Sequence, residues 1–301
     1  MGIATLATID HEVLDWGRVR ESTYLVHHVL RYAYPGPIAA LRHRLVVVPA
    51  ARFGDQRRLG YQVDVRGGAG EPAEVAEHGD RFGNLVVDVR AERVEVAIEF
   101  EAWALVRRCV GCPAPRVTAR AAERLGYTRP SRLTAPDAAI ADAAAGLAAA
   151  GPGGLALAER IAAWTSAAFT YSHGVTDVAT TAAGALAGRA GVCQDYAHVM
   201  LAVARSAGLA ARYVSGHLLG EGGTHAWVEV LLPDPERAGR LVAHGFDPTN
   251  ERRTGLGHVT VAVGRDYADV APTSGSFTAD YSGRLETSKR VGVTAVEYQA
   301  A

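Results

Sequence analysis

Short apolar runs dominate the first third of the chain. Five stretches are rich in β-branched residues or alternate between apolar and polar positions, at 24–32, 40–48, 60–65, 84–90 and 94–101. This alternation is typical of strands with one buried face. Turn-forming residues at 34–37 and 81–84 separate several of the stretches. Because no helical pattern lies between these strands, the sequence predicts an N-terminal antiparallel β-sandwich.

The pattern changes beyond residue 125. Apolar residues at helical spacing predict helices over about 135–150, over 155–169, and from Cys193 to Gly208, where glycine is suited to end a helix. Strands are predicted next, at 211–219, 226–232, 241–246 and 259–263. Helices followed by strands favour an α+β core. We therefore divide the chain into a β-rich domain over residues 1–125 and a catalytic domain over residues 126–301.

Composition narrows the class of protein. The 301 residues are 49% apolar and 21% charged, which is typical of a soluble globular protein, and the net charge is −1. That balance gives no reason to expect a nucleic acid or a membrane as partner. The N-terminal residues lack a basic start followed by an apolar run, so we expect no signal peptide and a cytoplasmic protein. The oligomeric state stays open.

The three cysteines are an odd number, which argues against a disulfide framework. Cys109 and Cys112 form a Cys-x-x-Cys pair, for which a redox pair, half a zinc site and a structural role are the alternatives. No second Cys/His pair lies nearby and a tetrahedral zinc site needs four ligands, so we favour the structural role. Neither a metal-binding nor a nucleotide-binding motif is present, and we expect no metal and no cofactor.

Three residues have side chains suited to catalysis. Cys193 follows a Gly-Val pair and opens a helical pattern, so we expect it at a helix N-terminus, where free N–H groups and the helix dipole favour the thiolate. His225 opens a predicted strand, and Asp247 ends the next one. A thiol, an imidazole and a carboxylate in this order are what covalent acyl transfer needs. The ordinary alternatives are an inert cysteine, a hydrogen-bonded strand histidine and an Asp-Pro turn.

Other residues compete for roles near this site. His198 lies five positions past the cysteine and would point away from it on a helix, whereas His217 lies on the preceding strand and could neighbour the site. Trp227 is expected on the same strand face as His225, where it either forms a wall of the acyl pocket or belongs to the core. Tyr171 is a candidate oxyanion donor, with plain packing as the alternative. Asp195 is expected to be a structural acceptor near the helix start.

Three blocks resemble a known family. They are Gly-Val-Cys-Gln-Asp-Tyr-Ala-His at 191–198, His-Ala-Trp at 225–227 and Phe-Asp-Pro-Thr at 246–249, with 32 positions between the cysteine and histidine and 22 between the histidine and aspartate. In this order they resemble the bacterial branch of the transglutaminase-like superfamily, and the resemblance covers roughly residues 22–298. It implies a papain-like core behind the β-rich region and a catalytic role for Cys193, His225 and Asp247.

The leading functional hypothesis is an enzyme that forms a thioacyl intermediate on an amide or peptide carbonyl. Resolution by water would make it a peptidase or amidase, and resolution by an amine a transglutaminase or amide-forming acyltransferase. The resemblance adds acyl thioesters of natural-product pathways as a further donor class. A non-catalytic binding or scaffold module on the same fold is the alternative from another class. The expected partners are a protein, a peptide, or a small acyl or amine substrate.

Overall fold

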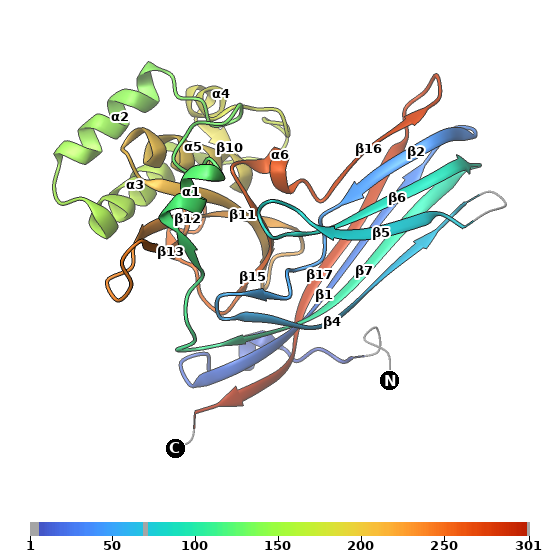
Figure 1. Cartoon of the computed structure of the whole chain (residues 1–301), viewed down its shortest axis with the longest axis horizontal. Coiled ribbons are helices and arrows are strands. Elements are labelled where there is room, and N and C mark those ends of the chain that lie inside the picture. Colours follow the sequence, from blue (N-terminus) through green and yellow to red (C-terminus); the bar gives the residue numbers. More distant parts are fainter. Residues whose placement is uncertain (1–5, 69–71, 300–301) are drawn as a thin grey trace.

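The computed structural model describes residues 6–68 and 72–299. Figure 1 shows a β-sandwich beside a second body in which helices cover one face of a sheet. The expected α+β class, an antiparallel sandwich followed by a papain-like core, is confirmed. Within the described residues, no helix combines the length and apolar character needed to cross a membrane.

The sandwich consists of a five-stranded and a four-stranded antiparallel sheet. The first has the order β17-β1-β7-β4-β3, from Arg284–Tyr298, Val19–Ala33, Ala97–Cys109, Gln56–Arg66 and Arg52–Phe53. The second has the order β16-β2-β6-β5, from Thr273–Thr278, Ile38–Leu45, Leu85–Val94 and Glu74–Gly79. Along β7, every second residue from Ile98 to Val106 is buried, as period-two alternation requires of a strand with one inner face.

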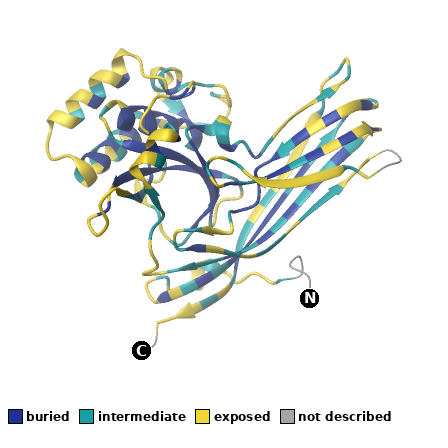
Figure 2. Cartoon of the chain, viewed as in Figure 1, coloured by how far each residue is buried: buried dark blue, intermediate teal, exposed yellow. Residues whose placement is uncertain are grey.

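The C-terminal strands return to this sandwich. β16 pairs with β2, and β17 pairs with β1 along its whole length, at the edge of the first sheet. Our division assigned all of residues 126–301 to the catalytic domain, whereas these strands lie in the sheets of the N-terminal part. The apolar pattern did not reveal them because both lie at sheet edges and their side chains are mostly exposed. β5 also escaped prediction, and Figure 2 shows it exposed.

The second body has an antiparallel sheet in the order β14-β13-β12-β11-β15, from Arg252–Arg253, Arg240–Asp247, His225–Pro233, Ala210–Leu218 and His258–Gly264. The short β8 (Arg116–Thr118) also pairs with β13. The helices are α1 (Ala119–Arg124), α2 (Ala138–Ala149), α3 (Gly154–Ala168), α4 (Ala182–Gly188), α5 (Cys193–Ser206) and α6 (Tyr267–Val270). Three of them match the predicted helices.

Helix α5 is the centre of the core. It packs on β11 and β12, and α2, α3 and α4 pack around it. Nearly all of its residues are therefore buried, as Figure 2 shows in dark blue. It ends before Gly208, whose φ of 82° lies in the left-handed region that glycine adopts without strain. The helix that starts with Cys193 is thus rigidly held from all sides.

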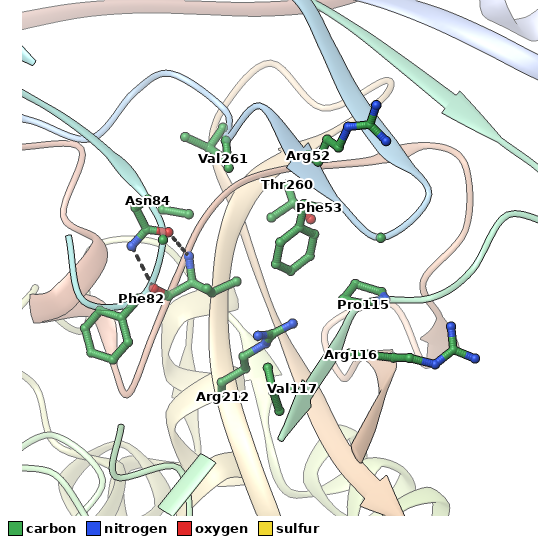
Figure 3. A pocket seen from close by; sticks show the side chains of 15 residues that line it. Arg52, Phe53, Phe82, Asn84, Pro115, Arg116, Val117, Arg212, Thr260 and Val261 are labelled. Carbon is green, nitrogen blue, oxygen red and sulfur yellow. Dashed lines mark hydrogen bonds between the residues drawn. The ribbon is translucent and has the colours of Figure 1, made fainter. Parts of the chain in front are cut away.

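Loops of the sandwich cover the opposite face of the core sheet. Phe53 and Phe82 pack against a buried cluster on that face. The amide of Asn84 donates to the Val263 carbonyl at 2.8 Å and accepts the Val263 N–H at 2.8 Å. Figure 3 shows these bonds beside a pocket of about 220 Å³ into which Arg212 points. The two bodies are therefore joined by specific backbone recognition as well as by apolar contact.

Candidate active site

Cys193 is the first residue of α5. The turn before it is closed by Asp195, whose Oδ2 accepts the Val192 N–H at 2.8 Å and the Thr176 hydroxyl at 2.7 Å. A Cβ at Gly191 would lie 2.5 Å from this oxygen, so only glycine allows the carboxylate to fold back over the turn. As expected from the sequence, Asp195 is a hydrogen-bond acceptor at the helix start. It orients the residue that carries the thiol.

The sheet brings His225 and Asp247 together. His225 is the first residue of β12 and Asp247 the last of the antiparallel β13, and the pairing of Val228 with Phe246 sets these ends side by side. His225 Nε2 lies 2.9 Å from Asp247 Oδ2, and both residues are buried, with 3% and 1% of their surface exposed. The ring therefore presents Nδ1 on its other side, away from the carboxylate.

Two further residues hold the carboxylate, and neither was predicted from the sequence. His258 Nε2 lies 3.1 Å from Asp247 Oδ2, and Asn250 Nδ2 donates to the same oxygen at 2.9 Å. The Gly255 N–H donates to His258 Nδ1, so the neutral ring carries its proton on Nε2 and donates it to the carboxylate. The only signal for these residues was their position, just after the aspartate and at the start of the next predicted strand.

These contacts set the charges of the site. Burial alone would raise the pKa of Asp247, but hydrogen bonds from the two histidines and from Asn250 hold it well below its usual range. Burial likewise lowers the pKa of His258, and the nearby carboxylate does not reverse that shift. The ligand atoms of His225, Asp247 and His258 lie within 4.8 Å of one another, as at a metal site, yet their hydrogen bonds explain this cluster without an ion.

The free nitrogen of His225 has a second acidic neighbour. Glu221, on the loop before β12, places Oε2 at 3.2 Å from His225 Nδ1, and 43% of its side chain is exposed. Burial would lower the pKa of His225, but the two carboxylates and a hydrogen-bond interaction with the Cys193 thiol raise it to about 11. The raised pKa favours the imidazolium at neutral pH, and the Cys193 thiol is among the groups that stabilise it.

The remaining predicted residues lie around this centre. Trp227 is 1% exposed and its ring stacks on His225 at 6.2 Å, so it walls the back of the imidazole. A Cβ at Gly216 would lie 2.5 Å from this indole, which explains the glycine there. Tyr171 is 48% exposed and lies on β9 (Thr170–Tyr171), which pairs with β10 (Ala190–Gly191) just ahead of the nucleophile.

The two competing histidines do not join the centre. Among the described residues, no hydrogen bond links His217 or His198 to Asp247. His217 Nδ1 contacts the Gly223 carbonyl at 3.3 Å, and burial lowers its pKa to about 4. His198 Nε2 accepts the Tyr267 N–H at 3.2 Å beneath the sheet, and burial lowers its pKa to about 4 as well.

Cys109 and Cys112 form a disulfide, with a Cα–Cα distance of 5.7 Å. The odd cysteine count argues against a disulfide framework, and this single bridge departs from that expectation. Cys109 ends β7 and Cys112 lies in the turn after it, so the two residues meet across one turn. Cys193 is free. Since the chain has three cysteines, its only free thiol is the one beside His225.

Comparison with known proteins agrees with this architecture. Residues 141–237 match the transglutaminase-like superfamily and residues 24–107 match the bacterial transglutaminase-like N-terminal region. The first match includes Cys193 and His225 and ends ten positions before Asp247. The resemblance to the bacterial transglutaminase-like superfamily is therefore confirmed, with a transglutaminase-like core joined to the N-terminal region that is found in its bacterial members.

Relatives and a solved structure extend the comparison. An uncharacterized protein of Mycobacterium tuberculosis is 42% identical over 118 residues, which are 36% of this chain and 37% of that protein. An uncharacterized protein of Mycobacterium leprae is 38% identical over 134 residues, which are 41% of this chain and 44% of that protein. The matched part thus spans less than half the length of each relative. The crystal structure of a candidate cysteine protease from Cytophaga hutchinsonii covers 90% of this chain and 92% of its own at 22% identity, with a TM-score of 0.67, which shows the shared fold.

Proposed function

We propose that this protein is a cysteine-dependent acyl-transfer enzyme that acts on an amide or peptide carbonyl through a thioacyl intermediate. The observation that carries the proposal is the arrangement at α5. The only free thiol begins a buried helix and is among the groups that raise the pKa of His225, whose Nε2 is hydrogen-bonded to the buried carboxylate of Asp247. An inert structural cysteine needs neither the imidazolium nor the carboxylate.

The steps follow from the atoms in place. His225 holds the proton of the Cys193–His225 pair on Nδ1, and the sulfur attacks the carbonyl carbon, forming a C–S bond and an oxyanion. The C–N bond breaks as His225 returns the proton to the leaving nitrogen, so an amine departs and a thioester remains. Water or a second amine then attacks the thioester, and the thiol is regenerated. Asp247 holds the ring in position throughout.

The oxyanion needs donors close to the sulfur. As the first helical residue, Cys193 has a backbone N–H without an intrahelical acceptor, and it points toward the helix start. Tyr171 supplies the second candidate, because its strand lies beside Gly191 and the residue is about half exposed. Charge on Cys193 is among the causes that raise the pKa of Tyr171, after burial, so its hydroxyl stays protonated and able to donate.

Substitution of the nucleophile tests the proposal. Two assays separate the outcomes: release of labelled peptides from casein reports hydrolysis, and incorporation of dansylcadaverine into casein reports aminolysis. Cys193→Ala should abolish whichever activity the wild-type protein shows, while unfolding free energy changes by no more than about 1–2 kcal/mol. Full activity in a folded Cys193→Ala protein would exclude the covalent mechanism.

A measurement independent of the substrate uses the single free thiol. An ordinary thiol is almost entirely protonated at pH 6, so its alkylation by iodoacetamide is slow. The imidazolium beside Cys193 predicts alkylation at least about tenfold faster than that of a neutral model thiol at this pH. A rate equal to that of the model thiol would identify an ordinary cysteine and favour the binding-module alternative.

A further inference from the structure

The turn at 255–258 carries His258 into the active site. Its sequence is Gly-Leu-Gly-His, and two glycines in four residues give the free chain many conformations. Within the turn, the His258 N–H donates to the Gly255 carbonyl at 3.0 Å, and the Gly255 N–H donates to His258 Nδ1 at 3.2 Å. The position of the imidazole therefore depends on the position of the turn backbone.

The β-sandwich holds this backbone from outside the catalytic body. Arg108, near the end of β7, donates through Nη1 to the Gly255 carbonyl at 2.6 Å. The same nitrogen donates to the carbonyls of Leu256, at 3.4 Å, and of His258. The Tyr24 hydroxyl on β1 donates to the Leu256 carbonyl at 2.7 Å. One charged group of the sandwich thus contacts three of the four carbonyls of the turn, and charged donors form the stronger hydrogen bonds.

Arg108 is itself held in place. Asp55 Oδ2 accepts hydrogen bonds from Arg108 Nη2 at 2.6 Å and from Nε at 3.1 Å. Both side chains are largely buried. The disulfide between Cys109 and Cys112 closes the chain just after Arg108. Because the guanidinium is planar and two of its nitrogens bind Asp55, the third nitrogen is fixed in its direction toward the turn.

Side-chain packing leaves space beside the turn. A cavity of about 400 Å³ is lined by the turn, by Arg108, by the disulfide and by Trp227. A turn that borders such a space can shift into it unless its backbone is held. The hydrogen bonds from Arg108 therefore fix the turn where packing does not, and they fix with it the ring that lies 3.1 Å from Asp247 Oδ2.

We propose that Arg108 is a positioning residue of the active site, which holds the turn so that His258 Nε2–H donates to Asp247. Its effect on catalysis rests on the proposed function, whereas the hydrogen bond itself does not require a nucleophilic Cys193. Arg108 acts through His258 and not on the substrate. The sandwich is thus a working part of the active site, because one of its strands sets a donor to the catalytic carboxylate.

A double-mutant cycle tests this route of action. Arg108→Met keeps an unbranched side chain without donors and should lower kcat/KM in the casein assays roughly three- to tenfold, no more than His258→Leu does. In the His258→Leu background, the same substitution should cause less than about a twofold further loss. Arg108→Lys keeps one charged donor group and should recover part of the activity. An equal loss in both backgrounds would show that Arg108 only stabilises the fold, and would overturn the proposal.

An NMR measurement tests the positioning without any activity. A ring N–H that is bonded to a buried carboxylate exchanges slowly with water, so His258 Nε2–H should give a resolved imidazole signal, identified by its loss in His258→Leu. Arg108→Met should broaden or remove this signal. Arg107→Gln changes the neighbouring residue of β7, which pairs with Glu21 on the sandwich, and should leave the signal unchanged. A wild-type signal in Arg108→Met, or an equal change in Arg107→Gln, would refute the positioning role.

The two readouts separate the possible failures. If the signal is lost in Arg108→Met but the wild-type protein has no activity that depends on Cys193, the proposed function fails and the positioning role stands. Should Arg108→Met not fold, Arg108→Lys supplies the test, because the ion pair with Asp55 remains but a single ammonium cannot also span the turn carbonyls. Exchange of the His258 proton at the wild-type rate in Arg108→Lys would then overturn the proposal.

Discussion

His225 and His217 lie side by side on strands β12 and β11, where His225 pairs with Gly216, the neighbour of His217. Both residues are buried, with 3% of the surface of His225 and 1% of that of His217 exposed. Their pKa values are nevertheless shifted in opposite directions. Burial lowers the pKa of His217 to about 4, whereas carboxylate and thiol neighbours outweigh burial at His225 and raise its pKa to about 11.

The groups that contact a buried imidazole determine the direction in which its pKa shifts. Among the described residues, the hydrogen-bond partner of His217 is the neutral carbonyl of Gly223, which does not offset the loss of water around a charged ring, and the Lys289 charge disfavours that form further. His225 meets Asp247 on one side and Glu221 on the other, and these two negative charges compensate the imidazolium. One sheet therefore holds a structural neutral histidine next to a charged one suited to proton transfer.

We expect the greatest loss of activity when the negative charge of Asp247 is removed. Asp247→Asn keeps the shape of the side chain but loses its charge, so the pKa of His225 should fall toward that of His217. The imidazolium is then lost at lower pH, and the alkaline limb of activity shifts downward. We expect kcat/KM to fall by about 10²–10⁴-fold. The casein assays, together with the pH titration of the His225 NMR signal, measure both effects.

A matched change at the other histidine serves as the control. In His217→Asn, the amide Nδ2 can still donate to the Gly223 carbonyl as the ring Nδ1 does, so activity should stay within about threefold. An equal loss of activity in both variants would contradict the division of roles between the two histidines.

Stability against pH should also separate the two rings. The lowered pKa of His217 contributes stability that is present above the ordinary value of 6.5 and is lost as pH falls toward about 4. The raised pKa of His225 contributes stability that is present below 6.5 and is lost as pH rises toward about 11. Urea unfolding should show His217→Asn losing roughly 1–3 kcal/mol less than wild type between pH 6.5 and 4. An identical acid slope in both proteins would refute the assignment for His217.

We expect a smaller loss of activity when His258, which also donates to the Asp247 carboxylate, is replaced. His258→Leu removes the Nε2–H that Asp247 accepts, while the bonds from His225 and Asn250 remain. We therefore expect an activity loss of about tenfold. His258→Gln retains a donor at the position of Nε2 and should recover most of that loss. If the two variants are equally impaired, the ring matters for packing against Trp227 rather than for its hydrogen bond.

The smallest effect is expected at Glu221. Its side chain is nearly half exposed, so water screens its attraction to His225 more than that of Asp247. Glu221→Gln should lower the pKa of His225 slightly and change kcat/KM by no more than about threefold. A large gain in activity would instead show that Glu221 competes with the thiol for Nδ1 in the resting protein.

Prediction from the sequence succeeded where the information is local. The helices of the core, the strands with one buried face and the helix that begins at Cys193 each show their period within about 10 to 15 residues. The edge strand β17 has 15 residues, but they are mostly exposed, so the strand lacks the alternation of apolar and polar residues that would predict it. Asn250 and His258 likewise have no distinguishing pattern, since their role depends on where Asp247 lies.

Short-range periodicity and motif residues encode the fold class, the order of thiol, imidazole and carboxylate, and the helix start that presents the thiol, so these features can be predicted from the sequence. Which buried histidine has a raised pKa and where Lys289 lies depend instead on tertiary packing. His225 and Asp247 are 22 positions apart, and Lys289 and Thr224 are 65 apart. Such pairs form through strand register and sheet packing, which join distant segments and cannot be read from local patterns.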